Sequence, residues 1–570
     1  MITAPWDSDI VSTAVGGMDS GTEPELVGEH VATKLRNVSI RGGRAHSRPR
    51  TKLVATLPSG KIQGAKIFEE KGDLLISVGG KVYVTQPGVW TLEEKTDETT
   101  RGNPNRPRHW FCETQGSVII QDFQSPPLIY DGADFRVADE VTEVPVGGPM
   151  AYANGRLAVT VGTGGQIRIG DIRQPEHQSE LKFTETYFLT GGGDFSFASK
   201  VRALASLPVI DTSSGQGSLI VGSGERVSSL KTQITSRDIW ADTEFQTELF
   251  PDVGITGPTA VAAVNQDLFI RAGDGLRSIR AAVADLSSPG QTPLSREVAH
   301  RFDHDTPHLL EYASVAYFDN RIFVTHSPIQ YGNRGINLGL IVYNFDSLSR
   351  SGQKSAPVFD GEWDFAQIAE MVVGKVNGTR RCFVVGRDVD GANGVWEIFR
   401  ESDDPVEVTE SPVQVMETRA LVGRGINAYK ALRRCDVNLT KIKSDVNLKI
   451  YFRAGHYPFW VLWDEFDVSA GLPVGVTRPR SLQRIVSTRS APDGFDEQTQ
   501  QPYNHGFSFQ VRVEWTGEAQ IDLLNVFTEL VTQPSPSDNV GTVDGKQYGA
   551  IPANQTDPVF WFPYSSSPNP

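Results

Sequence analysis

Apolar and polar residues alternate over short distances along most of this chain, and few stretches repeat apolar residues at the spacing of a helix. Short runs rich in Val, Ile, Phe and Tyr are separated by turns, and the chain has 55 glycines and 34 prolines. DLLISVGGKVYVT, residues 73–85, predicts a hairpin, because Gly79 and Gly80 can take the positive φ angles of a tight turn. ALRRCDVNLTKIKSDVNLKIYF, residues 431–452, alternates and predicts two strands. The pattern therefore predicts an all-β protein.

A unit of apolar strands separated by turns recurs seven times before residue 400. The units start roughly 40 to 60 residues apart, a spacing that suits the four-stranded blade of a β-propeller. They cover Gly64–Val84, His109–Gly132, Pro149–Ile172, Val201–Leu230, Thr259–Ile279, Tyr312–Phe345 and Ile368–Phe399. We therefore expect a β-propeller of about seven blades over residues 61–400.

The chain changes character on both sides of this region. Residues 401–412 are acidic and contain proline, which is typical of a linker. Strand-like runs such as VNLKIYF and FSFQVRVEW predict a β-sandwich over residues 413–531. We expect extended arms at residues 1–60 and 532–570, the first acting as a docking segment. Aromatic residues near the end of the second arm favour contact with a partner, and these are Phe560, Trp561, Phe562 and Tyr564.

Composition excludes several classes of protein. Apolar residues make up 39% and charged residues 22%, which does not fit a disordered chain, and no apolar run is long enough for a membrane span. Asp7 and Asp9 stand where an export signal needs cations, so we expect a soluble protein that folds in a cytoplasm. Cys112, Cys382 and Cys435 lie far apart and predict buried thiols without a disulfide framework.

Charge is segregated along the chain. The formal net charge is -15, yet no Asp or Glu occurs between Val31 and Phe68. NVSIRGGRAHSRPR, residues 37–50, contains four arginines and no acid: Arg41, Arg44, Arg48 and Arg50. An acidic protein repels nucleic acid over most of its surface, so this basic segment needs its own explanation. One explanation is that its arginines are solvated or pair with acidic loops of the same chain.

Two glycine-rich motifs resemble ligand-binding loops but predict turns. GTGGQIRIG, residues 162–170, lacks the lysine and hydroxyl of a phosphate-binding loop and leads into a strand, so it predicts a hairpin turn. DVDGANG, residues 388–394, offers oxygen ligands for calcium, but Ala392 stands at the fifth position and no glutamate closes the loop. It therefore predicts a turn within a blade.

Candidate catalytic chemistry is sparse. His300, His304 and His308 would line one face of a helix and could bind a transition metal, but Pro307 disfavours that helix, and we expect solvated loop histidines. No GxSxG elbow occurs, and acidic pairs fall in the expected linker. We accordingly expect no enzyme, no metal and no cofactor.

Three stretches together resemble the tail nozzle, or tail hub, proteins of short-tailed bacteriophages. AVGGMDSGTEPELV followed by LRNVSIRGGRAHSRP resembles the N-terminal segment of that family, at Asn37, Arg41, Gly42, Arg48 and Pro49. PPLIYDG, residues 126–132, with VPVGGPMAYANGRLAV, residues 144–159, is similar to a blade junction in such proteins. The third stretch is the sandwich-like region after the propeller. One departure is Arg50, which follows Pro49 where the family often has glycine.

The resemblance implies a virion structural protein, made in the host cytoplasm and resident in the phage tail. Its expected assembly is a homo-hexameric ring, with neighbouring adaptor, tail fibre or spike proteins. DNA would pass along the axis during genome ejection without specific binding, because an acidic wall repels phosphates and lets the duplex slide. In this interpretation the four arginines of the basic segment dock on an acidic neighbour in the tail. The alternatives are a propeller that binds or degrades glycans at the host surface and a cellular propeller scaffold.

Overall fold

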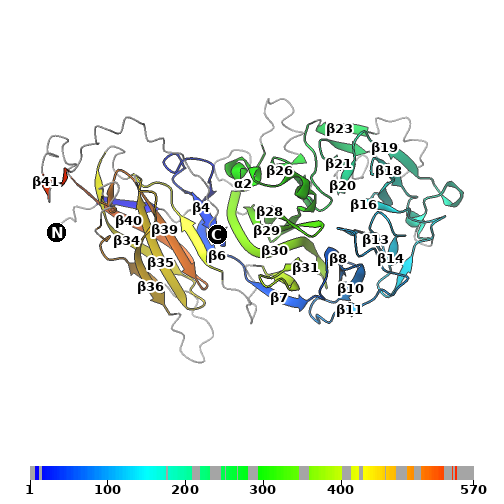
Figure 1. Cartoon of the computed structure of the whole chain (residues 1–570), viewed down its shortest axis with the longest axis horizontal. Coiled ribbons are helices and arrows are strands. Elements are labelled where there is room, and N and C mark those ends of the chain that lie inside the picture. The colour runs from blue at the N-terminus through cyan, green and yellow to red at the C-terminus, as the bar shows by residue number, and fades with distance from the viewer. Residues whose placement is uncertain are drawn as a thin grey trace.

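The computed structural model describes two β-rich domains that lie side by side (Figure 1). It describes residues 7–11, 16–174, 177–207, 218–230, 246–250, 252–265, 267–279, 293–345, 358–400, 412–422, 428–455, 457–469, 484–492, 494, 502–531, 542–543 and 546–547. Within these residues, no helix combines the length and apolar character that a bilayer crossing needs. The predicted all-β fold is confirmed.

The first domain is a β-propeller with seven blades in the described residues. Blades one to four are antiparallel four-stranded sheets, and three strands of blade five are described. Their strands are β8 (Ile62–Phe68), β9 (Asp73–Val78), β10 (Lys81–Thr85), β11 (Glu93–Glu94), β12 (Trp110–Glu113), β13 (Val118–Gln121), β14 (Leu128–Tyr130), β15 (Phe135–Val137), β16 (Gly147–Ala153), β17 (Arg156–Val161), β18 (Gln166–Ile169), β19 (Gly193–Ser196), β20 (Val201–Leu207), β21 (Ser218–Ser223), β22 (Val227–Leu230), β23 (Gln246–Phe250), β24 (Val261–Val264), β25 (Asp267–Ala272) and β26 (Gly275–Ser278). Each of these sheets coincides with one of the repeated units in the sequence.

The last two blades share one long, bent strand. Blade six contains β27 (Val315–Phe318), β28 (Arg321–Tyr331), β29 (Arg334–Asn344) and the first half of β30 (Val358–Val376). Blade seven contains the second half of β30 with β31 (Thr379–Arg387) and β32 (Asn393–Ile398). The innermost strands β8, β12, β16, β20, β24, β27 and β30 each contact the next, and β30 contacts β8, so the ring is closed.

The N-terminal segment completes the propeller. Strand β7 (Thr51–Thr56) pairs antiparallel with β32, from Gly394 opposite Thr56 to Ile398 opposite Thr51. It is the outermost strand of blade seven, and Figure 1 shows it in blue beside β31. The expected boundary at residue 61 is therefore wrong, because a strand before it supplies the backbone partners that β32 lacks. The described part of residues 1–60 therefore does not form a separate arm.

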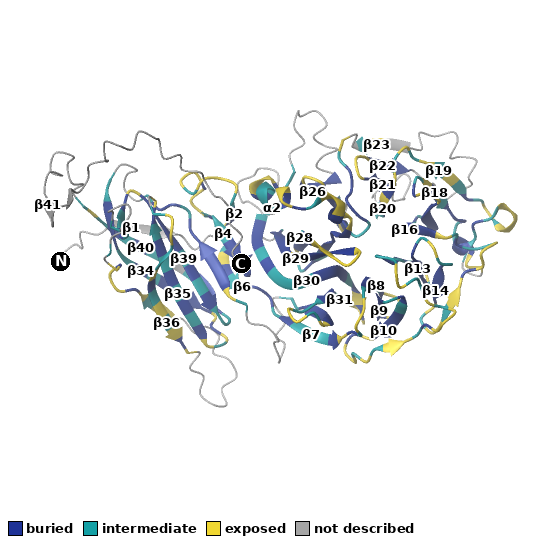
Figure 2. Cartoon of the chain, viewed as in Figure 1, coloured by how far each residue is buried: buried dark blue, intermediate teal, exposed yellow. Residues whose placement is uncertain are grey.

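The blades are held together by apolar faces that pack against one another. All six residues of β9 are buried, as expected for a strand that is covered on both faces. One hydrophobic cluster between blades one and two contains Phe68, Leu75, Val118 and Ile120. Buried residues concentrate in the strands of both domains, whereas exposed residues gather in the turns (Figure 2). The predicted hairpin of residues 73–85 is confirmed by φ angles of 59° at Gly79 and 86° at Gly80.

The second domain is a β-sandwich built from two parts of the chain. One layer has the strand order β37-β34-β40-β6-β5, with β1 and β38 at its side, and the other has the order β4-β33-β39-β35-β36. The strands are β1 (Asp7–Val11), β4 (Lys34–Arg36), β5 (Val38–Arg41), β6 (Arg44–Ser47), β33 (Gln414–Glu417), β34 (Lys430–Thr440), β35 (Val446–Ala454), β36 (Val461–Val468), β37 (Arg484–Ser487), β38 (His505–Gly506), β39 (Phe509–Thr516) and β40 (Gln520–Leu530). Residues 413–531 supply most of the strands of the sandwich, and the N-terminal segment supplies the rest.

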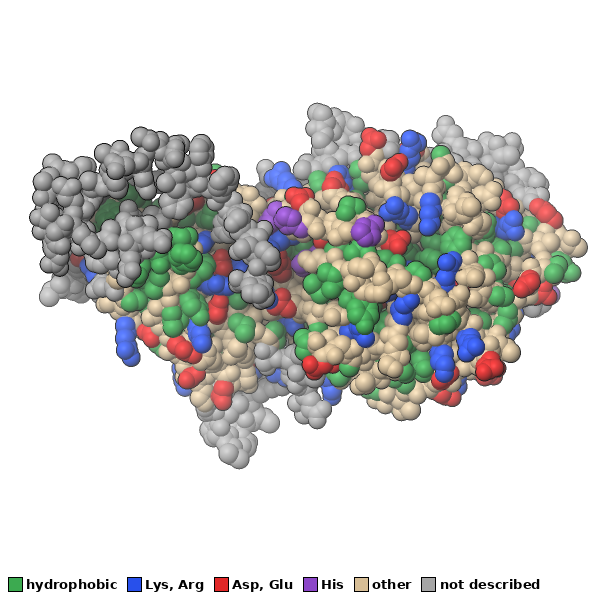
Figure 3. Space-filling model, in the orientation of Figure 1, with side chains coloured by type: hydrophobic (Ala, Val, Ile, Leu, Met, Phe, Trp, Pro, Cys, Tyr) green, Lys and Arg blue, Asp and Glu red, His purple; other side chains and the backbone are tan. Residues whose placement is uncertain are grey.

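The core of the sandwich joins residues of both layers in one cluster, which includes Leu432 and Val526 from one layer and Phe452 and Trp515 from the other. The alternating stretch 431–452 forms β34 and β35, which lie in different layers. The remaining elements are short, namely β2 (Gly17–Met18), β3 (Val31–Ala32), η1 (Ser179–Leu181), η2 (Glu185–Tyr187), η4 (Arg296–Val298), α2 (Ala299–Asp303), η5 (Pro307–Tyr312), β41 (Thr542–Val543) and β42 (Lys546–Gln547). The face shown in Figure 3 intersperses acidic, basic and hydrophobic side chains over both domains.

A buried histidine makes the propeller sensitive to acid. His109 is 2% exposed, its Nδ1 lies 2.7 Å from Ser77 Oγ, and burial lowers its pKa from 6.5 to about 4. Folding therefore favours the neutral ring, so its contribution to stability is complete above pH 6.5 and is lost as the pH falls through about 4. We expect this residue to lower the free energy of unfolding by about 2–3 kcal/mol between about pH 7 and about pH 4.5.

Urea unfolding of the wild type and of His109→Gln at both pH values measures how much of this loss of stability is due to His109. The variant is expected to lose less stability on acidification than the wild type does. His308→Gln, at an exposed position, is the matched control and should follow the wild type. An equal loss in the wild type and in His109→Gln would contradict the expectation.

Candidate functional site at the domain junction

The basic N-terminal segment runs through both domains and lies where they meet. Strand β4 belongs to one layer of the sandwich and also forms a parallel bridge to β30, at Arg36 and Glu362. The hairpin of β5 and β6 belongs to the other layer, and β7 then enters the propeller. Gly42 and Gly43 form the hairpin turn with φ angles of 58° and 76°, which residues with a Cβ atom rarely adopt. The segment therefore links the two domains.

Asn37 fixes the segment to the propeller at the point where β4 ends. Its φ angle is 55°, a left-handed conformation that asparagine tolerates better than most residues, and it is 1% exposed. Its Nδ2 donates to Asp364 Oδ2 at 2.8 Å and to the Val413 carbonyl at 3.0 Å, and its Oδ1 accepts from the Asp364 amide at 2.9 Å. One side chain thus connects β30, the segment and the start of the second domain.

A buried ionic network lies next to this contact. Arg321 of blade six is fully buried, and its guanidinium contacts Asp319 Oδ2 at 2.8 Å and Asp360 Oδ2 at 3.2 Å. It also donates to Ser39 Oγ of β5. Asp360 Oδ1 accepts from the Ile40 amide at 2.5 Å, and burial raises the pKa of Asp360 to about 6. Because these groups belong to both domains, relative movement would leave buried polar groups without partners.

The four predicted docking arginines all have partners within the chain. Arg41 pairs with Asp319 at 2.9 Å, Arg44 with Asp522 at 3.2 Å, and Arg50 with Glu518. Arg48 is 6% exposed, donates from Nη1 to the Asp364 carbonyl at 2.6 Å, and lies over the Phe365 ring. These contacts match the alternative stated above, in which the arginines pair with acidic residues of the same chain. The geometry favours a role in joining domains over a role in docking.

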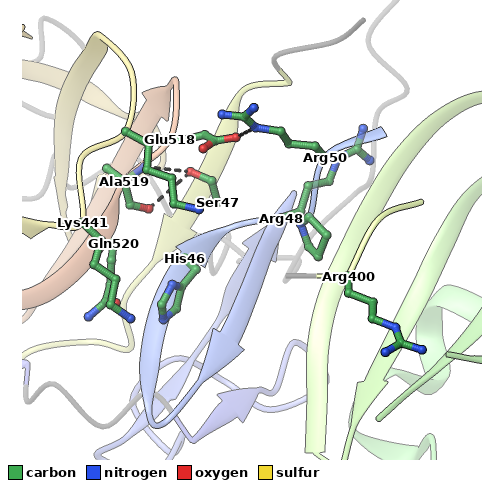
Figure 4. Close-up of a pocket in the computed structure, with 11 residues that line it drawn as sticks. His46, Ser47, Arg48, Arg50, Arg400, Lys441, Glu518, Ala519 and Gln520 are labelled. Carbon is green, nitrogen blue, oxygen red and sulfur yellow. Dashed lines mark hydrogen bonds and ion pairs between the residues drawn. The ribbon is translucent and has the colours of Figure 1, made fainter. Parts of the chain in front are cut away.

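The segment also lines a basic pocket of about 140 Å³ (Figure 4). Its charged residues are five cations and one carboxylate, namely Arg48, Arg50, Arg400, Lys441, Lys443 and Glu518, with His46 beside them. Figure 4 shows Arg50 reaching Glu518 across the opening and Ser47 hydrogen-bonded to Ala519. Such a surplus of positive charge attracts anionic groups. Several of these side chains make further interactions within the chain, and these are His46, Arg48, Arg50, Arg400 and Lys443.

Sequence reasoning found the first part of this pocket and missed the rest. Arg400 ends the last blade, and Lys441 and Lys443 lie in the turn between β34 and β35. The only signal in the sequence is the pair of lysines in KIK, residues 441–443, between two predicted strands. Nothing in a linear pattern brings that turn to the N-terminal segment.

The other motifs are structural in the described residues. GTGGQIRIG forms the turn between β17 and β18 and the whole of β18. DVDGANG forms the turn between β31 and β32, where the Ala392 amide donates to Asp388 Oδ1 at 2.7 Å. Both turn predictions are confirmed. His300 lies on the short helix α2 and is half-buried, with its ring next to Ser20. His304 and His308 are exposed. No group of three or more potential metal ligands occurs in the part of the chain that the structure describes.

The remaining predictions concern the cysteines, the linker and the C-terminal arm. The three cysteines are buried and unpaired, as predicted, and burial raises the pKa of the Cys112 thiol to about 12. Residues 401–411 of the expected linker lie outside the described residues. So do the predicted arm contacts, which are Phe560, Trp561, Phe562 and Tyr564.

The chain was also compared with known proteins. No protein-family model and no curated protein matches the chain. Among solved structures, the chain is similar to a chain of the mitotic checkpoint complex, with 12% identity, a TM-score of 0.35, and coverage of 62% of this chain and 92% of that one. It is also similar to the β-propeller domain of Cps50 (Swd1) from Myceliophteria thermophila, with 12% identity, a TM-score of 0.34, and coverage of 61% and 100%. The class of protein is an all-β propeller protein with an added sandwich.

Proposed function

We propose that this chain is a structural subunit of a short bacteriophage tail, in the nozzle or hub, and that it forms a hexameric ring through which DNA leaves. The observation that carries the proposal is where the residues that resemble that family lie. Asn37 fixes β30 to the second domain, Gly42 permits the turn of the β5–β6 hairpin, and Arg48 packs on Phe365 at the junction. The N-terminal part of the resemblance therefore coincides with the contacts that hold the two domains together.

The second stretch of the resemblance also has a definite place in the fold. It covers β14 of blade two and most of the hairpin of β16 and β17 in blade three, so its residues lie in two neighbouring blades. Gly147 and Gly148 begin β16, where an added Cβ atom would collide with the Thr160 carbonyl and with the Phe123 ring respectively. Gly148 allows the Phe123 ring of blade two to approach blade three closely, whereas Gly147 allows the close pairing of β16 with β17 within blade three. Both glycines support an architectural reason for the similar sequence.

Charge is compatible with a DNA conduit. The net charge is -15, and the cations of the basic segment contact carboxylates or carbonyl oxygens of the same chain. An assembly of such subunits presents an acidic wall, which repels phosphates instead of holding them through counterion release. A rigid junction also suits a subunit that must keep its shape in a ring.

Electron microscopy and mass measurement of the purified full-length chain test the proposal. We expect closed rings with sixfold symmetry, and labelled chains at the distal end of the tail in virus particles. We also expect no turnover of polysaccharide. A chain that remains monomeric and is absent from particles, or that cleaves glycans, would contradict the proposal.

A further inference from the structure

A second basic depression lies at one end of the propeller axis, away from the domain junction. It is a cavity of about 400 Å³, formed by residues at or just before the start of the innermost strands β12, β16, β20, β24 and β27 and by two loops between middle strands. We call it the mouth. Its residues come from five of the seven blades, and Arg108 and Trp110 also line the cavity that continues between the innermost strands. A ligand of the mouth would therefore be held at the centre of the ring.

The charged side chains at the mouth are mainly basic. Four cations line it, Arg106, Arg108, Lys200 and Arg202, against the two acids Asp122 and Glu311. Asp122 is engaged by its own surroundings, since its two carboxylate oxygens accept bonds from Asn103, Gln124 and Ser125. The four cations outnumber the two acids, so the mouth keeps a surplus of positive charge.

The cations of the mouth differ in burial, and Arg106 is half-buried with its Nε donating to the Asp122 carbonyl at 2.9 Å. Arg108 is 5% exposed and is held by the Glu311 carbonyl at 2.6 Å and Thr259 Oγ1 at 2.6 Å. Lys200 and Arg202 are exposed, and within the described residues no carboxylate lies within ion-pair distance of either. A buried, fixed guanidinium and two exposed cations at one cavity favour an anion that enters from solvent.

One wall of the mouth is aromatic and is built with unusual backbone geometry. The Trp110 and Phe123 rings are 5.6 Å apart and nearly perpendicular. Phe123 has a φ angle of 67°, which is rare for a bulky side chain and clusters at functional sites. Its ring occupies the space that a Cβ atom on Gly148 would need. The position of this ring beside the cations therefore requires backbone strain at Phe123 and a glycine at position 148.

We propose that the mouth binds an acidic sugar, a pyranose ring that bears a carboxylate or a phosphate group. Cations bind the anionic group through charge-assisted hydrogen bonds, and an aromatic wall packs against the apolar face of the ring. The cavity has the size of a small-ligand site. A long polyanion such as nucleic acid is disfavoured, because the rest of a chain with net charge -15 repels it. This site is independent of the proposed tail function.

Titration of the full-length chain by calorimetry tests the proposal. The probes are glucuronate, glucose 6-phosphate, inorganic phosphate, neutral glucose and a single-stranded DNA oligonucleotide. We expect saturable binding of at least one acidic sugar, weaker binding of inorganic phosphate, and none of neutral glucose. The binding should weaken as salt is added, because exposed charges are screened.

Variants then locate the site. Lys200→Gln with Arg202→Gln removes two exposed charges and should weaken sugar binding by about tenfold or more. The matched control is Lys71→Gln with Lys375→Gln, which removes two exposed charges near the turns at the opposite end of the propeller axis and should bind as the wild type does. Phe123→Ala should weaken binding of the sugar but not of inorganic phosphate, because phosphate makes no ring contact.

Several results would overturn the proposal. These are the absence of saturable binding to both acidic sugars, equal binding of neutral glucose, and undiminished binding by the Lys200 and Arg202 variant. Preferential binding of the oligonucleotide at the mouth would also overturn it and assign the site to nucleic acid. Circular dichroism of each variant, compared with the wild type, confirms that the folded protein was titrated.

Discussion

A fragment of residues 51–400 is expected to be far more stable than the fragment 61–400, which is expected not to close its propeller. The two differ by β7, the outermost strand of blade seven, which pairs with β32. Without β7, the backbone groups of β32 lose their partners, and the buried residues Thr51, Ala55 and Leu57 are removed. The expected loss exceeds the cost of one large core truncation, which is about 2–5 kcal/mol.

Urea unfolding followed by circular dichroism, together with gel filtration, measures this difference. Both fragments lack the sandwich, so both expose the same junction surface, and the comparison isolates the closing strand. If the two fragments unfold at the same urea concentration with the same cooperativity, β7 does not close the propeller. A full-length chain measured alongside gives the contribution of the sandwich.

The sequence was sufficient to predict the blades but not their closure. Each repeated unit is a local pattern, since its strands are joined by short turns such as Gly79 and Gly80, and periodicity reports on neighbours in the chain. TKLVAT, residues 51–56, is an ordinary short strand by the same criterion. Its partner β32 comes at the end of the propeller region of the sequence. No local pattern predicts a pairing between strands so far apart along the chain.

The charges of the candidate site could likewise be predicted only in part. The run without acids between Val31 and Phe68 singled out the basic segment correctly, because segregation of charge is visible in a sequence. The acids that neutralise it, among them Asp319, Asp364 and Glu518, belong to distant strands and turns. A sequence gives the sign of a charge and not its partner, so the segment was expected to face another protein.

Reversing the charge of Arg41, Arg44, Arg48 and Arg50 together is expected to destabilise the isolated chain severely. Glutamate at Arg41 or Arg44 would face Asp319 or Asp522, and glutamate at Arg48 would place an unpaired charge at a position that is 6% exposed. A buried charge that loses its partner costs about 3–5 kcal/mol, whereas the exposed position 44 should add little. We expect a fall in the thermal midpoint of many degrees, measured by calorimetry before any assembly assay.

A control variant with the same change in net charge distinguishes loss of the junction from a general effect of charge. The control reverses four cations elsewhere, the exposed Lys71, Arg226 and Lys375 and the half-buried Arg168. It changes the net charge equally but leaves the junction intact, and solvent-accessible pairs such as Arg168 with Asp194 contribute little. That control should unfold close to the wild type. If the arginines instead serve only to dock on an acidic neighbour, the fourfold variant will unfold like the control and fail only in assembly. An unchanged thermal midpoint would therefore support an interface with another protein. A large fall in the midpoint would support the role of the basic segment in joining the propeller to the sandwich.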